Sequence, residues 1–194
     1  MWNWLRNLFK RKPVTTFDRA VPKEVAKVYN EFLRARGTSR DFGNPRYIAE
    51  VNLGLNSKYN RFFIYDRVTK KLHKFKTSHG SGRSNRSPNN GECREVGNIS
   101  GSHMSCLGLF ECAETYHGRL GYCMRIDGLS STNSKARPRA ILVHKARYVR
   151  QDSNGIQGMS WGCFAIDVRH NKWVIDVLKN GSPLFAHHNG KTKI

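Results

Sequence analysis

The pattern of apolar and polar positions divides the chain into a short helical part and a longer part built of strands. Before residue 46, apolar residues recur at intervals of three and four, which is the spacing of an amphipathic helix. From Tyr47 onward, short runs of alternating apolar and polar residues are separated by Gly, Ser, Asn and Pro, as in strands with one buried face. The pattern predicts a mainly β domain over residues 46–194, preceded by a basic helical extension over residues 1–45.

Two helices are expected in the extension. The first covers residues 1–12 and ends at Pro13, and its apolar positions are Trp2, Leu5, Leu8 and Phe9. The second runs from Lys23 to about Arg36, because Pro22 favours a helix start and Gly37 favours a helix end.

Seven strands are expected in the domain, at residues 47–53, 61–66, 71–78, 107–113, 121–128, 139–146 and 163–168. The apolar segment 172–178 fits either a further strand or a helix. Residues 79–92 are rich in Gly, Ser and Asn, and a loop of this length in a compact domain is usually functional or disordered.

The charge of the chain is strongly unbalanced. With 34 Lys and Arg against 14 Asp and Glu, the net charge is +20, which predicts attraction to a polyanion. Nucleic acid, an anionic membrane and an acidic wall polymer all fit. Nucleic acid is the less favoured partner, because the sequence has no zinc finger, aromatic RNP signature or basic-heptad helix.

The N-terminal segment bears on where the protein works. No apolar run reaches 18 residues, so no transmembrane helix is expected. Residues 1–12 do not resemble a Sec signal, because their charges follow the apolar residues. A short basic amphipathic helix of this kind suits an anionic membrane surface, and docking on the domain or a disordered start are the alternatives.

The chain has five cysteines, and no two of them form a CxxC pair. An odd number leaves at least one thiol free if the others pair within the chain. The spacing of His103, Cys106 and Cys112 matches no standard zinc finger, so neither a metal nor a cofactor is predicted. Disulfides between Cys106 and either Cys112 or Cys123 are left open.

One cysteine has a sequence context that suits a nucleophile. Cys163 follows Gly162 and opens an apolar run, while His144 closes the apolar run 139–143. A thiol needs a base or a cation nearby to become a thiolate, and two strand ends can bring His144 within reach of Cys163. Amide groups near Gly162 then suit an oxyanion. A buried, inert cysteine is the alternative.

Five segments, in order, resemble the murein L,D-transpeptidase catalytic domain family, the YkuD-like enzymes. They are YIAEVNLGLNSKYNRFFIYD, SHGSGRSN, SCLGLFECAETYHGRLGYCMRIDGL, ARPRAILVHKARYV and GMSWGCFAI, which fall between residues 47 and 168. Each segment is a loose match, and the ordered set is specific. The resemblance implies a β-sandwich or mixed-sheet fold of the L,D-transpeptidase type.

The resemblance also assigns roles to individual residues. Cys163 matches the nucleophile, His144 its activating base, and Ser160 and Gly162 the turn before the nucleophile. The amides of Gly162 and Cys163 are expected to form the oxyanion hole. The positions matched to the substrate groove are His79, Gly80, Tyr116, Arg125 and Asn133.

Arg139 and Phe164 are two further positions near the proposed nucleophile and base in the sequence. Arg139 precedes the histidine-bearing strand, where it suits a bidentate clamp on a substrate carboxylate, and a plain surface arginine fits equally well. Phe164 stands where many family members have an arginine directly after the nucleophile. This departure weakens the transfer of detailed substrate contacts and leaves the Cys–His pair intact.

The implied function is acyl transfer on peptidoglycan tetrapeptide stems through a Cys163 thioester. Hydrolysis of the same thioester gives an L,D-carboxypeptidase instead. A cysteine peptidase with another substrate, a non-catalytic wall-binding or virion protein, and a nucleic-acid-binding module are the remaining alternatives. The expected site of action is the cell wall or periplasm, reached from a phage particle, by lysis or by specialised secretion.

Overall fold

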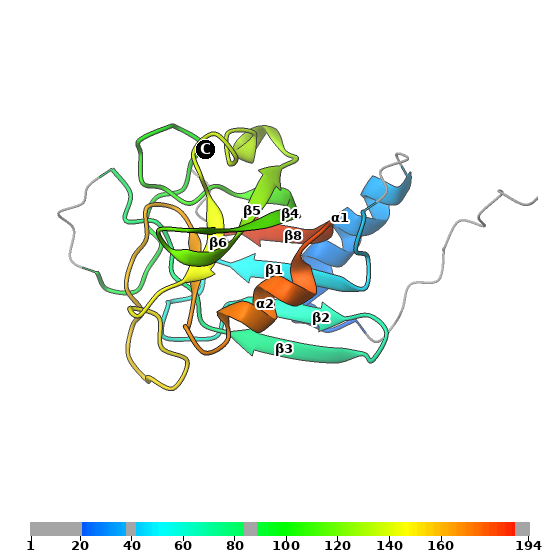
Figure 1. Cartoon of the computed structure of the whole chain (residues 1–194), viewed down its shortest axis with the longest axis horizontal. Helices are drawn as coiled ribbons and strands as arrows, with labels where there is room; N and C mark the ends of the chain where they lie inside the picture. The colour runs from blue at the N-terminus through cyan, green and yellow to red at the C-terminus, as the bar shows by residue number, and fades with distance from the viewer. Residues whose placement is uncertain (1–20, 38–41, 84–88, 189–194) are drawn as a thin grey trace, which may run out of the picture.

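The computed structural model describes residues 21–37, 42–83 and 89–188 (Figure 1). The helix expected over residues 1–12 lies outside these ranges. The helical elements are η2 (Lys23–Val25), α1 (Ala26–Gly37), η3 (Ser131–Asn133) and α2 (Asn171–Leu178). The strands are β1 (Tyr47–Asn52), β2 (Phe62–Asp66), β3 (Lys71–Phe75), β4 (Gly108–Gly118), β5 (Gly121–Gly128), β6 (Leu142–Lys145), β7 (Phe164–Ile166) and β8 (Ser182–His187).

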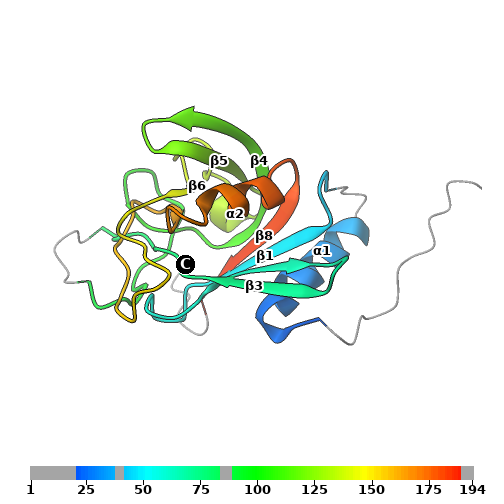
Figure 2. The same ribbon diagram turned by 60° about the horizontal axis from the view of Figure 1, so that its bottom comes forward.

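The strands form one eight-stranded mixed sheet in the order β3-β2-β1-β8-β4-β5-β6-β7. The pairs β1–β8 and β6–β7 are parallel, and the other neighbouring strands are antiparallel. Figure 2 shows how the sheet curves, with β4 and β5 on one side of α2 and β1 and β3 on the other. The expected mainly β fold with mixed strand directions is confirmed.

The segment with two possible structures, residues 172–178, is helical, and its interpretation as a strand is wrong. Its buried residues follow helical spacing: Asn171, Val174, Ile175 and Leu178. Three of them enter the main core between the two halves of the sheet. An amphipathic helix can pack one apolar stripe against both halves of the curved sheet, whereas a single strand cannot contact both.

The other face of the sheet carries α1. Ile48 of β1 packs with Val28 of the helix, while its neighbour Ala49 points into the main core. Glu50, only 3% exposed, accepts hydrogen bonds from the backbone N–H groups of Lys27 and Val28, at 3.1 Å each. A carboxylate from β1 thus satisfies N–H groups in the first turn of α1, which have no partner within the helix. Whether residues 1–45 form a separate extension stays a prediction.

The chain beyond β3 leaves the sheet edge and crosses to the opposite edge strand, β7. The N–H of Ser78 donates to the carbonyl of Ala165 at 3.3 Å, and the Thr77 hydroxyl donates to the same carbonyl at 2.8 Å. Further along, Gly80 forms a parallel bridge with Ser160. Residues 76–78 were expected to end a strand, but they lie beyond β3. Instead, residues 77–82 lie against the turn that carries Cys163.

Candidate active site

Cys163 lies at the end of a tight turn that leads into β7. Ser160 Oγ accepts a hydrogen bond from the N–H of Gly162 at 3.1 Å and donates one to the carbonyl of Cys163 at 2.7 Å. Gly162 has a φ of +113°, and a Cβ there would lie 2.6 Å from the carbonyl oxygen of Met104. Both the backbone conformation and the space at this position therefore require glycine.

A second layer of hydrogen bonds holds this turn from the side of residues 78–80. The N–H of Ser160 donates to the carbonyl of His79 at 2.8 Å, and Ser78 Oγ donates to the carbonyl of Cys163 at 3.1 Å. Gly80 approaches so closely that a Cβ on it would lie 2.1 Å from the carbonyl oxygen of His103. The His-Gly dipeptide thus supports the cysteine turn through its backbone.

The side chain of His79 is buried, at 1% exposure, and does not line an open cleft. Arg61, also fully buried, donates to His79 Nδ1 at 2.7 Å and to the carbonyl of Thr77. Burial, together with the guanidinium of Arg61, lowers the pKa of His79 to about 3. His79 is therefore a neutral part of the scaffold under the turn.

The thiol of Cys163 is almost enclosed, with 9% of the residue exposed. It packs in a small cluster with Cys123, Leu142 and Tyr116, and Sγ lies 3.5 Å from the carbonyl oxygen of Ala140. Burial raises the pKa of the Cys163 thiol to about 11, a rise that a backbone hydrogen bond from Leu142 partly offsets. The resting nucleophile candidate is thus a neutral thiol.

His144 lies on β6, the strand that pairs with β7. It is 4% exposed, and its Nδ1 lies 2.8 Å from the carbonyl oxygen of Lys145. Because a carbonyl only accepts, this contact assigns the proton to Nδ1 and leaves Nε2 as the basic nitrogen. Burial lowers the pKa of His144, so its imidazole is neutral at pH 7.

The sheet register brings His144 and Cys163 to adjacent strands. His144 pairs with Ala165, two residues beyond Cys163, and Val143 pairs with Phe164. In the described ranges no hydrogen bond joins the thiol to the imidazole, since the thiol faces Ala140 and Nδ1 faces Lys145. Neighbouring strands thus carry a neutral thiol and a neutral imidazole, and a thiolate forms only when the thiol loses its proton.

This protonation state predicts how the free protein reacts with an alkylating agent. We expect the rate of Cys163 alkylation by iodoacetamide to rise about tenfold per pH unit between pH 7 and 10, because only the thiolate reacts. Peptide mapping by mass spectrometry separates Cys163 from the other cysteines. A rate that is flat from pH 6 to 9 would show a preformed thiolate–imidazolium pair and contradict this assignment.

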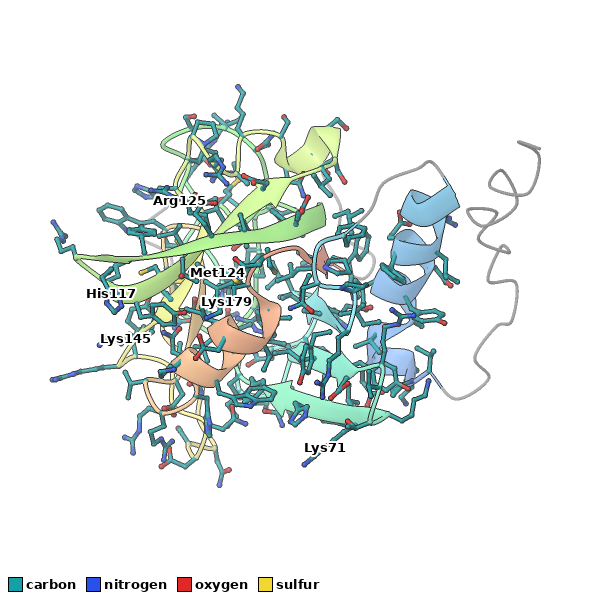
Figure 3. The ribbon with its side chains drawn as sticks, turned by 45° about the vertical axis from the view of Figure 1, so that its right-hand side comes forward. Lys71, His117, Met124, Arg125, Lys145 and Lys179 are labelled. Atoms are coloured by element: carbon teal, nitrogen blue, oxygen red, sulfur yellow. The ribbon has the colours of Figure 1, made fainter. Side chains whose placement is uncertain are left out.

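Two of the residues assigned to the substrate groove lie together beside the thiol. Tyr116 of β4 packs against the Cys163 cluster, and the guanidinium carbon of Arg125 lies 4.5 Å from the centre of its ring. Arg125 projects outward from β5 and pairs with Glu114 at 3.2 Å between Nε and Oε1 (Figure 3). The guanidinium of Arg125 is thus partly exposed and lies on Tyr116, which contacts the Cys163 cluster.

The other two assigned residues, Asn133 and Arg139, make hydrogen bonds to the backbone. Asn133 is fully buried, donates to the carbonyl of Leu109 at 2.8 Å and accepts from the N–H of Ser130 at 2.8 Å. Arg139 donates to the carbonyls of Gly97 and Met104, at 2.9 and 2.6 Å. Arg139 therefore ties down the loop that packs on Gly162, and a substrate-binding role for it or for Asn133 stays a prediction.

Sequence reasoning missed several residues around the thiol. Ser105 Oγ accepts from the N–H of Gly80 and donates to the carbonyl of Gly162, at 3.0 Å each. Burial raises the pKa of Tyr148, and so does the neighbouring Cys163. Trp161 is 70% exposed directly beside the cysteine turn. Only Trp161 carried a signal in the sequence, as a large aromatic residue in a polar turn next to Cys163.

None of the five cysteines forms a disulfide, so the pairings left open for Cys106 are not made. Within the part of the chain that the structure describes, no group of three or more His, Cys, Asp or Glu side chains is placed to hold a metal ion. In the same residues no helix combines the length and the apolar character needed to cross a bilayer.

A basic hollow with a volume of about 540 Å³ opens between the turn that joins β4 to β5 and the end of β6. Arg119, Lys145 and Arg147 contribute its charged side chains, and Leu120 and Val168 are among its apolar lining. Figure 3 shows Lys145 on this edge, below His117. These three basic side chains make the hollow positively charged, which suits the binding of an anionic group.

The chain was compared with protein families and with solved structures. A family model described as "L,D-transpeptidase catalytic domain" matches residues 19–187. An L,D-transpeptidase from Mycobacterium smegmatis has 12% sequence identity and a TM-score of 0.44, over 73% of this chain and 58% of that one. An L,D-transpeptidase from Mycobacterium tuberculosis H37Rv has 14% identity and a TM-score of 0.43, over 74% and 58%.

A third solved structure, the helical cell shape determining protein Pgp2 from Campylobacter jejuni, has 13% identity and a TM-score of 0.44. The match covers 78% of this chain and 50% of that one. The chain thus spans less than two thirds of the length of each of these three proteins. No curated protein matches the sequence.

Proposed function

Since the chain belongs to the L,D-transpeptidase catalytic domain family, we propose that it is a cysteine acyltransferase acting on the tetrapeptide stems of peptidoglycan. The observation that carries the proposal is the placement of Cys163 and His144. A buried turn holds the thiol at the start of β7, and the adjacent strand β6 holds a neutral imidazole whose Nε2 is free to accept a proton.

The proposed reaction begins with proton transfer from the Cys163 thiol to His144 Nε2. Sulfur then attacks the carbonyl of the bond between diaminopimelate and the terminal D-alanine, and a C–S bond forms. The tetrahedral intermediate collapses with cleavage of the C–N bond, and the imidazolium returns the proton to the departing amine. The product of this half-reaction is a thioester on Cys163 and free D-alanine.

The second half-reaction decides between the two activities. An amine of a neighbouring stem attacks the thioester, loses a proton to His144 and leaves a cross-link, while the thiol is restored. Water in place of the amine gives a tripeptide stem and makes the protein an L,D-carboxypeptidase. The exposure of the thiol, 9% in the free protein, does not discriminate between the two acceptors, because a stem amine is larger than water and needs at least as much access.

Two parts of the site have proposed roles in substrate binding. The amides of Gly162 and Cys163 would stabilise the oxyanion, although the Gly162 N–H also donates to Ser160 Oγ. Arg125, stacked on Tyr116, would bind a carboxylate of the stem. Phe164 has no role in binding, because it is fully buried and packs edge-on against Phe110 in the main core.

The proposed partner sets the place of action at the cell wall or periplasm. The basic hollow and the net charge of +20 support additional binding to anionic wall polymers. A contribution of residues 1–12 to binding at a membrane surface remains a further proposal. Delivery by a phage particle, by lysis or by specialised secretion is compatible with this place of action.

Product analysis tests the proposal. The protein is incubated with disaccharide-tetrapeptide, and the products are separated by chromatography and identified by mass. We expect release of D-alanine together with cross-linked dimers. Tripeptide monomers without dimers would assign carboxypeptidase activity, and binding to sacculi without any change in their composition would show a non-catalytic wall-binding protein.

A further inference from the structure

Trp161 exposes more of its surface than any other large apolar residue in the described ranges, at 70%. Its indole is nevertheless fixed, because it stacks on the imidazole of His103 with ring centres 4.6 Å apart and planes inclined by 15°. Leaving a large apolar ring in water forgoes the free energy of burying it, about 25 cal/mol per Å². An exposed ring that is held in one orientation beside a candidate nucleophile offers a flat apolar surface to a ligand.

The support beneath this stack is rigid. His103 adopts a φ of +54°, which is uncommon for a residue other than glycine, and the N–H of Gly82 donates to its carbonyl at 3.2 Å. Arg139 ties the same loop down through the carbonyl of Met104. One face of the indole is therefore held against His103, and the remaining exposure leaves surface for a ligand.

The chemistry of the proposed substrate limits what can cover this indole. The groups of the stem near the scissile bond are methyl, carboxylate and amine groups and the methylene chain of diaminopimelate, which is narrow and flexible, so none of them presents a rigid, flat apolar face as wide as an indole. The sugar rings of the glycan strand do, through the C–H groups on their faces. We propose that the Trp161–His103 stack is a subsite for a sugar ring of the glycan strand, an inference that rests on the proposed function.

The reach of the substrate agrees with this placement. The sugar is attached to the first residue of the stem, and the scissile carbonyl belongs to the third, so an extended stem separates them by about 10 Å. Trp161 is two residues from Cys163, so their Cα atoms are at most about 7 Å apart, and the indole extends further. One substrate molecule can therefore contact both groups.

A comparison of two substrates tests the subsite. kcat/KM is measured for disaccharide-tetrapeptide and for the sugar-free tetrapeptide, with the wild-type protein and with Trp161→Ala. We expect the substitution to lower kcat/KM about tenfold for the disaccharide substrate and to leave the sugar-free substrate unchanged. An equal loss on both substrates would assign Trp161 to the peptide, the amine or the turn, and no loss on either would remove it from binding.

The chain provides a matched control. Trp173 is also partly exposed, at 38%, and packs against a histidine, His73, with ring centres 4.5 Å apart and planes inclined by 46°, but it lies on α2. Trp173→Ala should change neither kcat/KM value. Thermal unfolding confirms that both variants are folded.

A binding measurement tests the sugar subsite independently of the proposed acyl-transfer function. Calorimetric titration of the peptide-free disaccharide into the full chain should show binding that Trp161→Ala weakens about tenfold. If the wild-type protein turns over neither substrate but binds the disaccharide in this way, the subsite stands and the acyl-transfer proposal fails. Disaccharide binding that is absent, or unaffected by Trp161→Ala, would overturn the subsite.

Discussion

Replacing Cys163 by serine is expected to reduce the release of D-alanine from disaccharide-tetrapeptide by at least about 10⁴-fold. A serine hydroxyl is a much weaker acid than a thiol, and His144 is a neutral base with a lowered pKa, so proton transfer from serine is strongly unfavourable. Serine is nearly isosteric with cysteine and keeps a donor for the carbonyl of Ala140. The measurement is single-turnover release of D-alanine with protein in excess.

Cys93→Ser is the matched control for this substitution. Cys93 is also buried, and burial raises the pKa of its thiol to about 12, but it lies in the main core. Its replacement should leave the rate of D-alanine release unchanged. Wild-type release by Cys163→Ser would place the nucleophile elsewhere, and loss of cooperative thermal unfolding in that variant would show that Cys163 is structural.

Replacing His144 by glutamine is expected to lower kcat by about 10²- to 10⁴-fold, which is the usual contribution of a general base. Glutamine is similar in size to histidine and does not titrate near neutral pH, so it removes the base with little change in volume, although its amide replaces Nε2 and not the Nδ1 that contacts the carbonyl of Lys145. His117→Gln is the control, because His117 is exposed on β4 and stacks on Tyr122 at 5.1 Å between ring centres. That substitution should leave kcat unchanged.

The burial of His144 also determines how the activity of the wild-type protein depends on pH. The base must be neutral to accept the thiol proton, and burial lowers the pKa of His144 below its ordinary value near 6.5. Activity is therefore present above this lowered pKa and falls as the pH drops through it, so the midpoint of the acidic limb should lie below the ordinary histidine value. His144→Gln should remove this acidic limb, and an unchanged limb in the variant would exclude His144 as the base.

The strands that the sequence predicts best are those with one clear buried face or with abundant β-branched and aromatic residues. Tyr47 to Leu53 and Arg61 to Asp66 are two such segments, and they form β1 and β2 within one residue of the expected bounds. The central strand β8 was not predicted. Its residues 182–187 are almost all buried, so they show no alternation, and Pro183 argues against a strand.

The residues of the candidate site also differ in how far the sequence predicts them. The local sequence around Cys163 and His144 is sufficient to single out both residues. The hydroxyls of Ser78 and Ser105 are not predictable, because they reach the cysteine turn from 85 and 57 residues away and no local pattern marks such hydrogen bonds. The resemblance places Asn133 near the substrate groove, and this role stays a prediction for a side chain that is buried and makes two backbone contacts.

The central claim is that Cys163 forms a thioester with the substrate. Mass spectrometry of the intact protein after rapid acid quenching of a reaction with disaccharide-tetrapeptide tests it most directly. The account predicts an added mass equal to the substrate less D-alanine, located by peptide mapping on the segment that contains Cys163. A folded protein that shows no adduct and releases no D-alanine would contradict the account.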